Sequence, residues 1–288
     1  EGGNAFDASV ATAATLNVVE PYMSGVGGIG LALVYIAKED RVRSLNFSGR
    51  APAAAEPARF TAETKDAGVM ASLVPGNVAG WLKLHDTYGS LDRERLFQPA
   101  IDYAANGFPI TRFNSRTIGQ SATRLSRYPS GSILLDSAGR PPKTGSCLVM
   151  PQLAETLREI GRHGSETFYR GELATRILKA NQAMGGLLTE EDLATYDARW
   201  QDPISISYRG LKVFTPPPNS SGFQILQTLK LMDGFGAADT IFQHPRTLHL
   251  MMEAVKLCVT DRIKYGGDPD FAPVPIEGLI SDAYAARQ

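Results

Sequence analysis

Residues 17–36 decide the fold of this chain, and they read NVVEPYMSGVGGIGLALVYI. An apolar helix is expected before the glycines of this stretch and an apolar strand after them. Gly25, Gly27 and Gly30 have the spacing G-x-G-x-x-G, which in a dinucleotide-binding fold follows a strand and opens a helix. Here the order is reversed, so no helix N-terminus is available to bind a phosphate. The glycines instead predict a tight turn whose backbone passes close to a ligand or to another strand.

The composition is that of an ordinary soluble globular protein. The chain has 288 residues, of which 43% are hydrophobic and 20% are charged, and its formal net charge is −1. This balance gives no indication of nucleic-acid binding. Cys147 and Cys258 fit no metal-binding or C-x-x-C spacing and are interpreted as buried or free thiols. No apolar run reaches the roughly 18 residues that a membrane span requires, and the composition assigns no compartment.

The first 47 residues predict a buried helix followed by a hairpin. Asn4 is a suitable N-cap, and residues 5–19 are apolar on nearly every face, as in a helix buried between layers. Strands are predicted at 31–37 and 41–47. The first is continuously apolar, so we expect it to be buried on both faces, whereas the second alternates apolar and polar residues. A sheet with layers on both sides follows from this pattern.

The rest of the chain mixes helices with a second hairpin, which favours an α+β layered sandwich over a regular parallel fold. Residues 111–150 carry six basic residues and one acidic residue, and we expect a solvated basic loop there. Helices are predicted from Val78 to before Gly89, from Pro99 to before Gly107, and after Pro245. Further helices are predicted at 151–160, 172–184, 189–196 and 223–231. The strands of the second hairpin are predicted at 204–208 and 212–214.

The chain contains no self-sufficient catalytic set. None of the four histidines has zincin spacing, so no metal site is predicted. Neither a G-x-S-x-G elbow nor an S-x-x-K motif is present. Asp268 and Asp270 are interpreted as turn residues beside Pro269. The best ligand candidate is Arg50, a permanent cation in a turn next to a glycine, with a surface salt bridge as the alternative interpretation.

Taken together, the turns resemble the large subunit of the gamma-glutamyltranspeptidase family. The matching segments follow the family order and cover almost the whole chain. They are GGNAFDASVA at 2–11, VEP at 19–21, SGVGG at 24–28, PGNVAG at 75–80, QPA at 98–100, FYRG at 168–171, GGLLTEEDL at 185–193, PPPNSSG at 216–222 and GDPDF at 267–271.

This resemblance implies an N-terminal nucleophile (Ntn) hydrolase, with a four-layer αββα sandwich shared between two subunits cut from one precursor. Residues 1–288 would form a single domain, the large-subunit part, without the ends of that subunit. The nucleophile would be the N-terminal Thr of the small subunit, whose α-amino group serves as the base, so no catalytic residue is expected on this chain. The family chemistry needs neither metal nor organic cofactor. The implied partners are the small subunit and a small acyl amide.

One departure from the family pattern concerns the substrate. Members that hydrolyse glutathione carry an arginine after the second strand, which binds the α-carboxylate of the donor, followed by a glutamate. Here Ser48 stands at the place of the arginine and Gly49 at that of the glutamate, while Arg50 lies two positions later. We therefore expect Ser48, Gly49 and Arg50 to form the substrate-binding wall.

Three functions remain open. The first is transfer or hydrolysis of gamma-glutamyl amides such as glutathione. The second is hydrolysis of a different acyl amide, as in the cephalosporin or glutaryl acylases of the same family. The third is a homologue that is not processed and acts only as a binding or structural protein.

Overall fold

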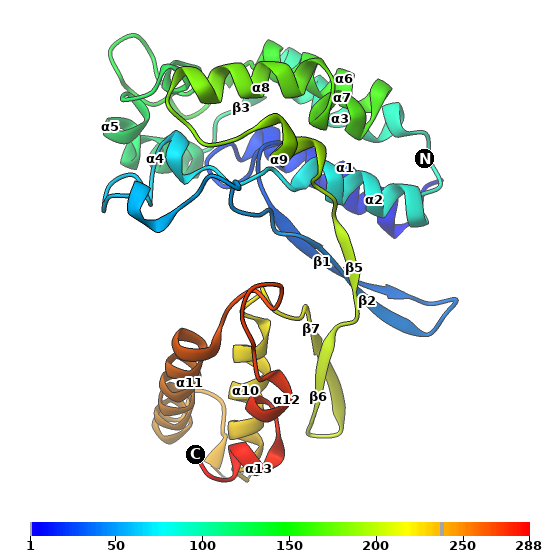
Figure 1. Ribbon diagram of the computed structural model, residues 1–288, viewed down its shortest axis with the longest axis vertical. Helices are drawn as coiled ribbons and strands as arrows, with labels where there is room; N and C mark the ends of the chain where they lie inside the picture. Colours follow the sequence, from blue (N-terminus) through cyan, green and yellow to red (C-terminus); the bar gives the residue numbers. More distant parts are fainter. Residues whose placement is uncertain (1, 237–238) are drawn as a thin grey trace. The chain divides into compact units, whose positions relative to one another are not determined.

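The computed structural model describes residues 2–236 and 239–288, and the chain divides into two compact units (Figure 1). One unit comprises residues up to 30 together with 47–198, and the other comprises 31–46 together with 199–288. Helices and strands are both present, which confirms the predicted mixture of α and β structure. Whether residues 1–288 act as a single domain stays a prediction.

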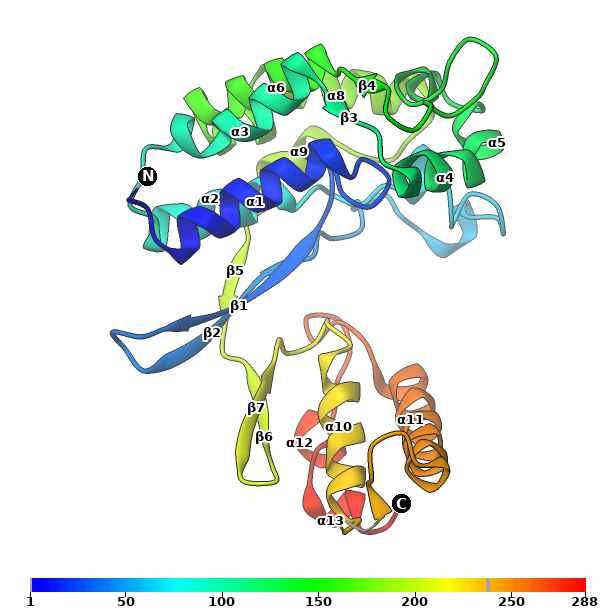
Figure 2. The ribbon, with the colours of Figure 1, turned by 180° about the vertical axis from the view of Figure 1, so that it is seen from behind.

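The first unit is mostly helical. Helix α1 packs against α2 and α3, and α3 packs against α6 (Figures 1 and 2). The elements are α1 (Ala5–Val19), η1 (Pro57–Arg59), η2 (Val69–Ala71), α2 (Asn77–Tyr88), α3 (Arg93–Asn106), β3 (Phe108–Pro109), α4 (Arg112–Gln120), α5 (Ala122–Leu125), η3 (Pro129–Ile133), β4 (Cys147–Leu148), α6 (Pro151–His163), α7 (Ser165–Tyr169), α8 (Glu172–Ala183) and α9 (Glu190–Ala194).

Helix α1 is fixed at its start by a capping box. The Asn4 side chain accepts hydrogen bonds from the N–H groups of Phe6 and Asp7, and the Asp7 carboxylate accepts one from Asn4 N at 2.9 Å. The same carboxylate accepts a hydrogen bond from the Ser90 hydroxyl at 2.6 Å and two from the N–H groups of Ser90 and Leu91. Asp7 therefore caps its own helix and also ties α1 to the segment after α2.

The second unit contains a three-stranded sheet, a hairpin and a helical pair. The sheet order is β1 (Gly30–Ile36), β2 (Arg41–Phe47), β5 (Arg199–Gln201), and β2 and β5 run antiparallel with Leu45 opposite Trp200. Strands β6 (Ile204–Tyr208) and β7 (Leu211–Thr215) form the predicted second hairpin. Helix α10 (Gly222–Asp233) packs on this hairpin and on α11 (Pro245–Tyr265), followed by α12 (Ile276–Leu279) and α13 (Asp282–Ala285).

The prediction that β1 is buried on both faces was wrong. Its side chains alternate, and Leu31, Leu33 and Tyr35 are 36%, 41% and 58% exposed. Within the described residues, β1 is also an edge of its sheet, because β2 is its one neighbour there. The continuous apolar run therefore belongs to a strand with one face that is exposed within the described residues.

Two other predictions about elements were wrong. Residues 111–150 are not simply a solvated loop, because Thr111 and Asn114 form a capping box that starts α4, and the segment also contains α5, η3 and β4. Helix α3 begins at Arg93 and not at Pro99, since Asp92 caps it by accepting a hydrogen bond from Glu94 N at 2.9 Å. Strand β5 was not predicted at all; its three residues are too few to show a period.

The Asp7 cluster makes a prediction about stability and pH. Burial favours the neutral form of Asp7, which is 1% exposed, but its hydrogen bonds outweigh this effect and lower its pKa from 3.8 to about 2. A lowered folded-state pKa stabilises the fold above the unfolded pKa, and this stabilisation is lost as the pH falls toward 2. We expect Asp7→Asn to lower the free energy of unfolding at pH 7 by about 2 kcal/mol.

The measurement is urea unfolding at several pH values between 7 and 2. The difference between wild type and Asp7→Asn should shrink below about pH 4. Asp66→Asn, at an exposed position of the same unit, serves as the control and should behave as wild type throughout. A difference between Asp7→Asn and wild type that does not depend on pH would contradict this account.

Candidate functional site

Three turns of the first unit meet through their backbones. The carbonyl oxygen of Gly28 accepts hydrogen bonds from Gly76 N and Asn77 N, both at 2.9 Å. The Asn77 side chain returns the contact by donating to the carbonyl oxygen of Gly25 at 2.8 Å. The turn after α1 thus lies against the start of α2. The turn does approach another backbone segment, but that segment is the start of a helix and not the strand that was predicted as one possibility.

Two glycines of this site cannot be replaced without displacement of backbone atoms. A Cβ atom on Gly76 would lie 1.9 Å from the carbonyl oxygen of Phe47, so the 75–80 turn and the end of β2 approach more closely than any side chain allows. Gly49 has φ +74°, and a Cβ there would lie 2.7 Å from the carbonyl oxygen of Val74. The segment 48–50 is therefore a left-handed turn pressed against 74–76.

The predicted wall residues Ser48, Gly49 and Arg50 lie consecutively in this turn. Val74 N donates to the carbonyl oxygen of Arg50 at 2.9 Å, which holds the turn to the segment before α2. Gly49 N donates to the Tyr196 hydroxyl at 3.2 Å. Ser48 and Gly49 are half-buried, while Arg50 is exposed. The turn thus has one side fixed to the protein and one side open.

Arg50 is bound to the end of α9. Its Nη2 donates to the carbonyl oxygen of Asp192 at 3.1 Å and to the Thr195 hydroxyl. Both hydrogens of Nη2 are therefore used, while Nε and Nη1 donate to no group within residues 2–236 and 239–288. A carboxylate needs two parallel N–H groups for bidentate binding, and each such pair in a guanidinium includes Nη2. Bidentate binding at Arg50 thus requires release of one bond to α9.

Asp192 holds both α9 and the turn. Its Oδ2 accepts hydrogen bonds from the N–H and hydroxyl of Thr189 at 3.0 and 2.8 Å, and its Oδ1 accepts one from Ala53 N at 2.9 Å. Burial opposes ionisation of Asp192, which is 3% exposed, but these hydrogen bonds and the nearby Arg50 charge outweigh it. The pKa of Asp192 consequently lies below its ordinary value, and the carboxylate stays ionised.

Tyr169 and Tyr196 stack beside the turns. Their ring centroids are 5.7 Å apart at an interplanar angle of 19°. The Tyr169 hydroxyl donates to the carbonyl oxygen of Pro75 at 2.8 Å and accepts from Ala79 N at 3.2 Å. Burial raises the pKa of Tyr169 well above its ordinary value, so this hydroxyl remains a neutral donor. Tyr169 therefore braces the start of α2, as Tyr196 braces the turn at Gly49.

The predicted residues Ser48, Gly49 and Arg50 lie in one turn, and their role stays a prediction; the residues that hold this turn were not predicted. Asp192, Thr195 and Tyr196 contact a segment some 140 positions earlier in the chain. The helix predicted at 189–196 begins at Thr189, the N-cap of α9, and the structure adds that Thr189 and Asp192 form a capping box there. Nothing in the sequence indicated that the second carboxylate oxygen binds Ala53 N.

The other singled-out residues have structural contacts. Asp268 Oδ1 accepts from Asp270 N at 3.0 Å, and Asp270 pairs with Arg199 at 2.6 Å, which confirms the interpretation as a turn. Cys147 and Cys258 are free thiols, exposed and buried respectively. Within the described residues, no cluster of three or more potential ligands could hold a metal ion, and no helix is long and apolar enough to cross a membrane.

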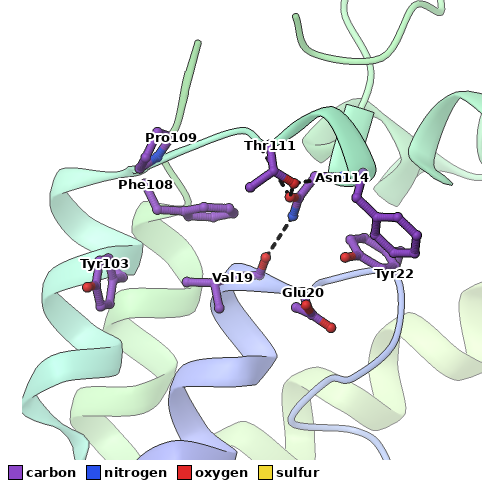
Figure 3. A pocket seen from close by; sticks show the side chains of 9 residues that line it. Val19, Glu20, Tyr22, Tyr103, Phe108, Pro109, Thr111 and Asn114 are labelled. Carbon is purple, nitrogen blue, oxygen red and sulfur yellow. Dashed lines mark hydrogen bonds between the residues drawn. The ribbon is translucent and has the colours of Figure 1, made fainter. Parts of the chain in front are cut away.

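A separate hollow of about 460 Å³ lies at the C-terminal end of α1 (Figure 3). Asn114 closes one side of it by donating to the carbonyl oxygen of Val19 at 2.8 Å. Aromatic residues line much of the remainder, with Tyr22 and Phe113 in edge-to-face contact. None of Ser48, Gly49 and Arg50 lines this hollow, so it is distinct from the turn site.

The protein is a chain of mixed α and β structure in which glycine-containing turns approach one another through their backbones. Within residues 2–236 and 239–288, one apolar face of strand β1 is exposed. The chain belongs to the gamma-glutamyltranspeptidase family, whose model matches residues 1–288. The family predicted from the order of the turns is thereby confirmed.

Known relatives agree with this assignment. The glutathione hydrolase proenzyme of Bacillus subtilis (strain 168) is 36% identical over 293 residues, covering 99% of this chain and 50% of the relative. The crystal structure of Helicobacter pylori gamma-glutamyltranspeptidase matches with a TM-score of 0.96 at 33% identity, covering 99% of this chain and 84% of that one. Cephalosporin acylase from Bacillus halodurans matches with a TM-score of 0.91 at 36% identity, covering 99% and 55%. The chain spans about half the length of the curated relatives it matches.

The close approach at Gly76 can be tested by substitution. Gly76→Ala should destabilise the protein by about 2 kcal/mol or more, because the added methyl group forces the end of β2 away from the start of α2. Thermal unfolding of Gly76→Ala against wild type measures this loss.

Gly25→Ala is the matched control in the adjoining turn, since a Cβ there meets no atom within 4 Å. It should unfold within about 0.5 kcal/mol of wild type. Equal stability of the two variants would show that the three turns do not require this contact.

Proposed function

We propose that this chain is the large-subunit part of an enzyme that transfers or hydrolyses gamma-glutamyl groups of glutathione-like amides. The observation that carries the proposal is the family match over all 288 residues. The partner is the small subunit from the same precursor, and its N-terminal Thr is the nucleophile. The half-length coverage of relatives that are proenzymes supports a second chain of this kind.

The chemistry follows from a nucleophile at a chain terminus. The Thr hydroxyl attacks the amide carbonyl, and its proton passes to the free α-amino group, which acts as the base. The C–N bond then breaks, the amine leaves with that proton, and an acyl ester remains on Thr. Water or an amino acceptor attacks the ester and releases the product. This chain contributes positioning and substrate contacts, and no residue of it forms a covalent bond.

Ser48, Gly49 and Arg50 form the wall for the acyl donor in this proposal. Nε and Nη1 of Arg50 are the N–H groups that its contacts with α9 leave available to the α-carboxylate of the donor. Single hydrogen bonds from a permanent cation attract a carboxylate but fix it less firmly than a bidentate pair does. Arg50 would thus take over part of the role of the family arginine, whose place Ser48 occupies.

The uncovered face of β1 is where the partner would pack. Leu31, Leu33 and Tyr35 are all exposed, and an apolar strand face of this kind usually marks an interface. We propose that layers from the small subunit cover it and complete a four-layer αββα sandwich. A second apolar layer would also account for the continuous apolar sequence of the strand.

A cephalosporin or glutaryl acylase is the second candidate. The presence of Ser48 in place of the arginine favours it, because that change alters the binding of the donor α-carboxylate. The similarity to cephalosporin acylase from Bacillus halodurans supports it as well. The two candidates differ in the acyl group and share the nucleophile, so substrate assays separate them.

The first experiment determines the intact mass and N-terminal sequence of every chain in the purified full-length product, with a gamma-glutamyl-p-nitroanilide assay on the same sample. We expect a second chain that starts with Thr, copurifies with this one, and releases p-nitroaniline. A Thr-started chain that cleaves only glutaryl amides would select the acylase. A single uncut chain without activity would overturn both enzyme candidates and leave a binding protein.

The role of Arg50 is tested in the same assay. Arg50→Ala should raise KM for gamma-glutamyl-p-nitroanilide by roughly tenfold or more, since a hydrogen bond to a charged group is lost. Arg50→Lys keeps the charge but not the planar fork, so its KM should be intermediate. An unchanged KM in Arg50→Ala, with an unfolding temperature equal to that of wild type, would remove Arg50 from the substrate wall.

A further inference from the structure

One short segment holds the candidate substrate turn at Gly49 and Arg50 and the chain just after it at Ala53. Gly49 N donates to the Tyr196 hydroxyl, Arg50 Nη2 donates to the Thr195 hydroxyl, and Ala53 N donates to Asp192 Oδ1. Residues 192–196 are here named the α9 brace. They accept hydrogen bonds from two backbone N–H groups and one arginine side chain of the segment 49–53.

The brace is itself rigid. Asp192 N donates to the Thr189 hydroxyl at 3.1 Å, and the hydroxyl donates back to Asp192 Oδ2. Leu193 is fully buried. The Thr195 hydroxyl donates to the carbonyl oxygen of Glu191 at 2.7 Å, so its lone pairs face Arg50 as acceptors. The Asp192 carboxylate and the Thr195 hydroxyl are therefore each oriented by a bond to a residue at or next to α9.

The brace is also attached to the start of α2. The Tyr196 ring stacks on Tyr169, whose hydroxyl binds the carbonyl oxygen of Pro75 and Ala79 N. A Cβ on Gly76 would lie 2.7 Å from the Tyr196 hydroxyl, so this hydroxyl sits directly between the two turns. The position of the turn at 48–50 is thereby linked to that of the 75–79 segment.

We propose that the α9 brace sets acyl-donor specificity by positioning the Ser48–Arg50 turn, with Thr195 and Tyr196 as positioning residues. This inference rests on the proposed function. The brace uses the Gly49 N–H and both hydrogens of Arg50 Nη2, and so decides which N–H groups of the turn a substrate can reach. Binding of an acyl donor whose carboxylate lies beside the turn depends on which N–H groups are free, whereas binding of an acyl donor without that carboxylate does not. Neither residue is required for attack on the amide carbonyl.

The test compares two donors that differ in the carboxylate alone, gamma-glutamyl-p-nitroanilide and 4-aminobutanoyl-p-nitroanilide. Thr195→Val and Tyr196→Phe should each lower the preference for the gamma-glutamyl donor by about three- to tenfold, through KM and with kcat nearly unchanged. In an Arg50→Ala background, Thr195→Val should have no further effect on this preference, because the contact it removes is already absent.

Two matched controls separate positioning from general stability. Thr156→Val removes the same type of hydroxyl bond to the carbonyl oxygen four residues earlier, on α6, without an arginine contact. Tyr284→Phe removes a tyrosine hydroxyl that binds Asp261 on α11 and not the turn or the brace. Both should lower the unfolding temperature, if at all, without changing the ratio of the two donors.

Hydrogen exchange provides a readout that needs no activity. In Tyr196→Phe, exchange of the peptide that contains Gly49 should accelerate about three- to tenfold, and it should not in Thr156→Val. Faster exchange with an unchanged donor ratio would overturn the proposal, as would unchanged exchange. If wild type cleaves neither anilide, the proposed function fails, and with it the assignment of specificity, whereas exchange still reports whether the brace holds the turn.

Discussion

The carbonyl oxygen of Gly28 accepts two hydrogen bonds from the first N–H groups of α2, and the arrangement of the site depends on this contact. The N–H groups at a helix start lack partners within the helix, and here another turn supplies one acceptor for two of them. Position 76 is a glycine because of a different contact, since a Cβ there would lie 1.9 Å from the carbonyl oxygen of Phe47. Once α2 starts there, Pro75 and Ala79 are placed to bind Tyr169.

Around this contact, polar groups serve two partners each. The Asp192 carboxylate caps α9 with one oxygen and holds Ala53 N with the other. The Thr195 hydroxyl donates within its helix and accepts from Arg50. The Gly49 N–H and both hydrogens of Arg50 Nη2 are thus already bonded, while Nε and Nη1 of Arg50 have no partner within residues 2–236 and 239–288. In our proposal, the acyl donor that this turn can bind therefore depends on which of its N–H groups are already bonded within the protein.

Local signals in the sequence gave most of the elements. The Asn4 cap marked a true helix start, the apolar run at 31–37 located β1, and the alternating pattern at 41–47 located β2. Prediction failed where the deciding partner was weak or distant. The Thr111 capping box was masked by the polar composition around α4, and β5 has three residues that are held as a strand by pairing with β2. The sequence of β1 did not distinguish an exposed apolar face from a buried one, because apolar residues show that a face favours burial but not which element covers it.

For the site, the order of the glycine and proline turns in the sequence identified the family, and the substrate wall at Ser48, Gly49 and Arg50 stays a prediction. These features are readable because a turn imposes its residue types locally, through φ and through steric limits. The tertiary structure alone decided that Arg50 is bound to α9, that Gly49 N is taken by Tyr196, and that the Gly28 turn meets α2. Those contacts join residues about 50 to 150 positions apart, and no local pattern encodes them, because a donor and its acceptor are matched by the packing of the elements that carry them.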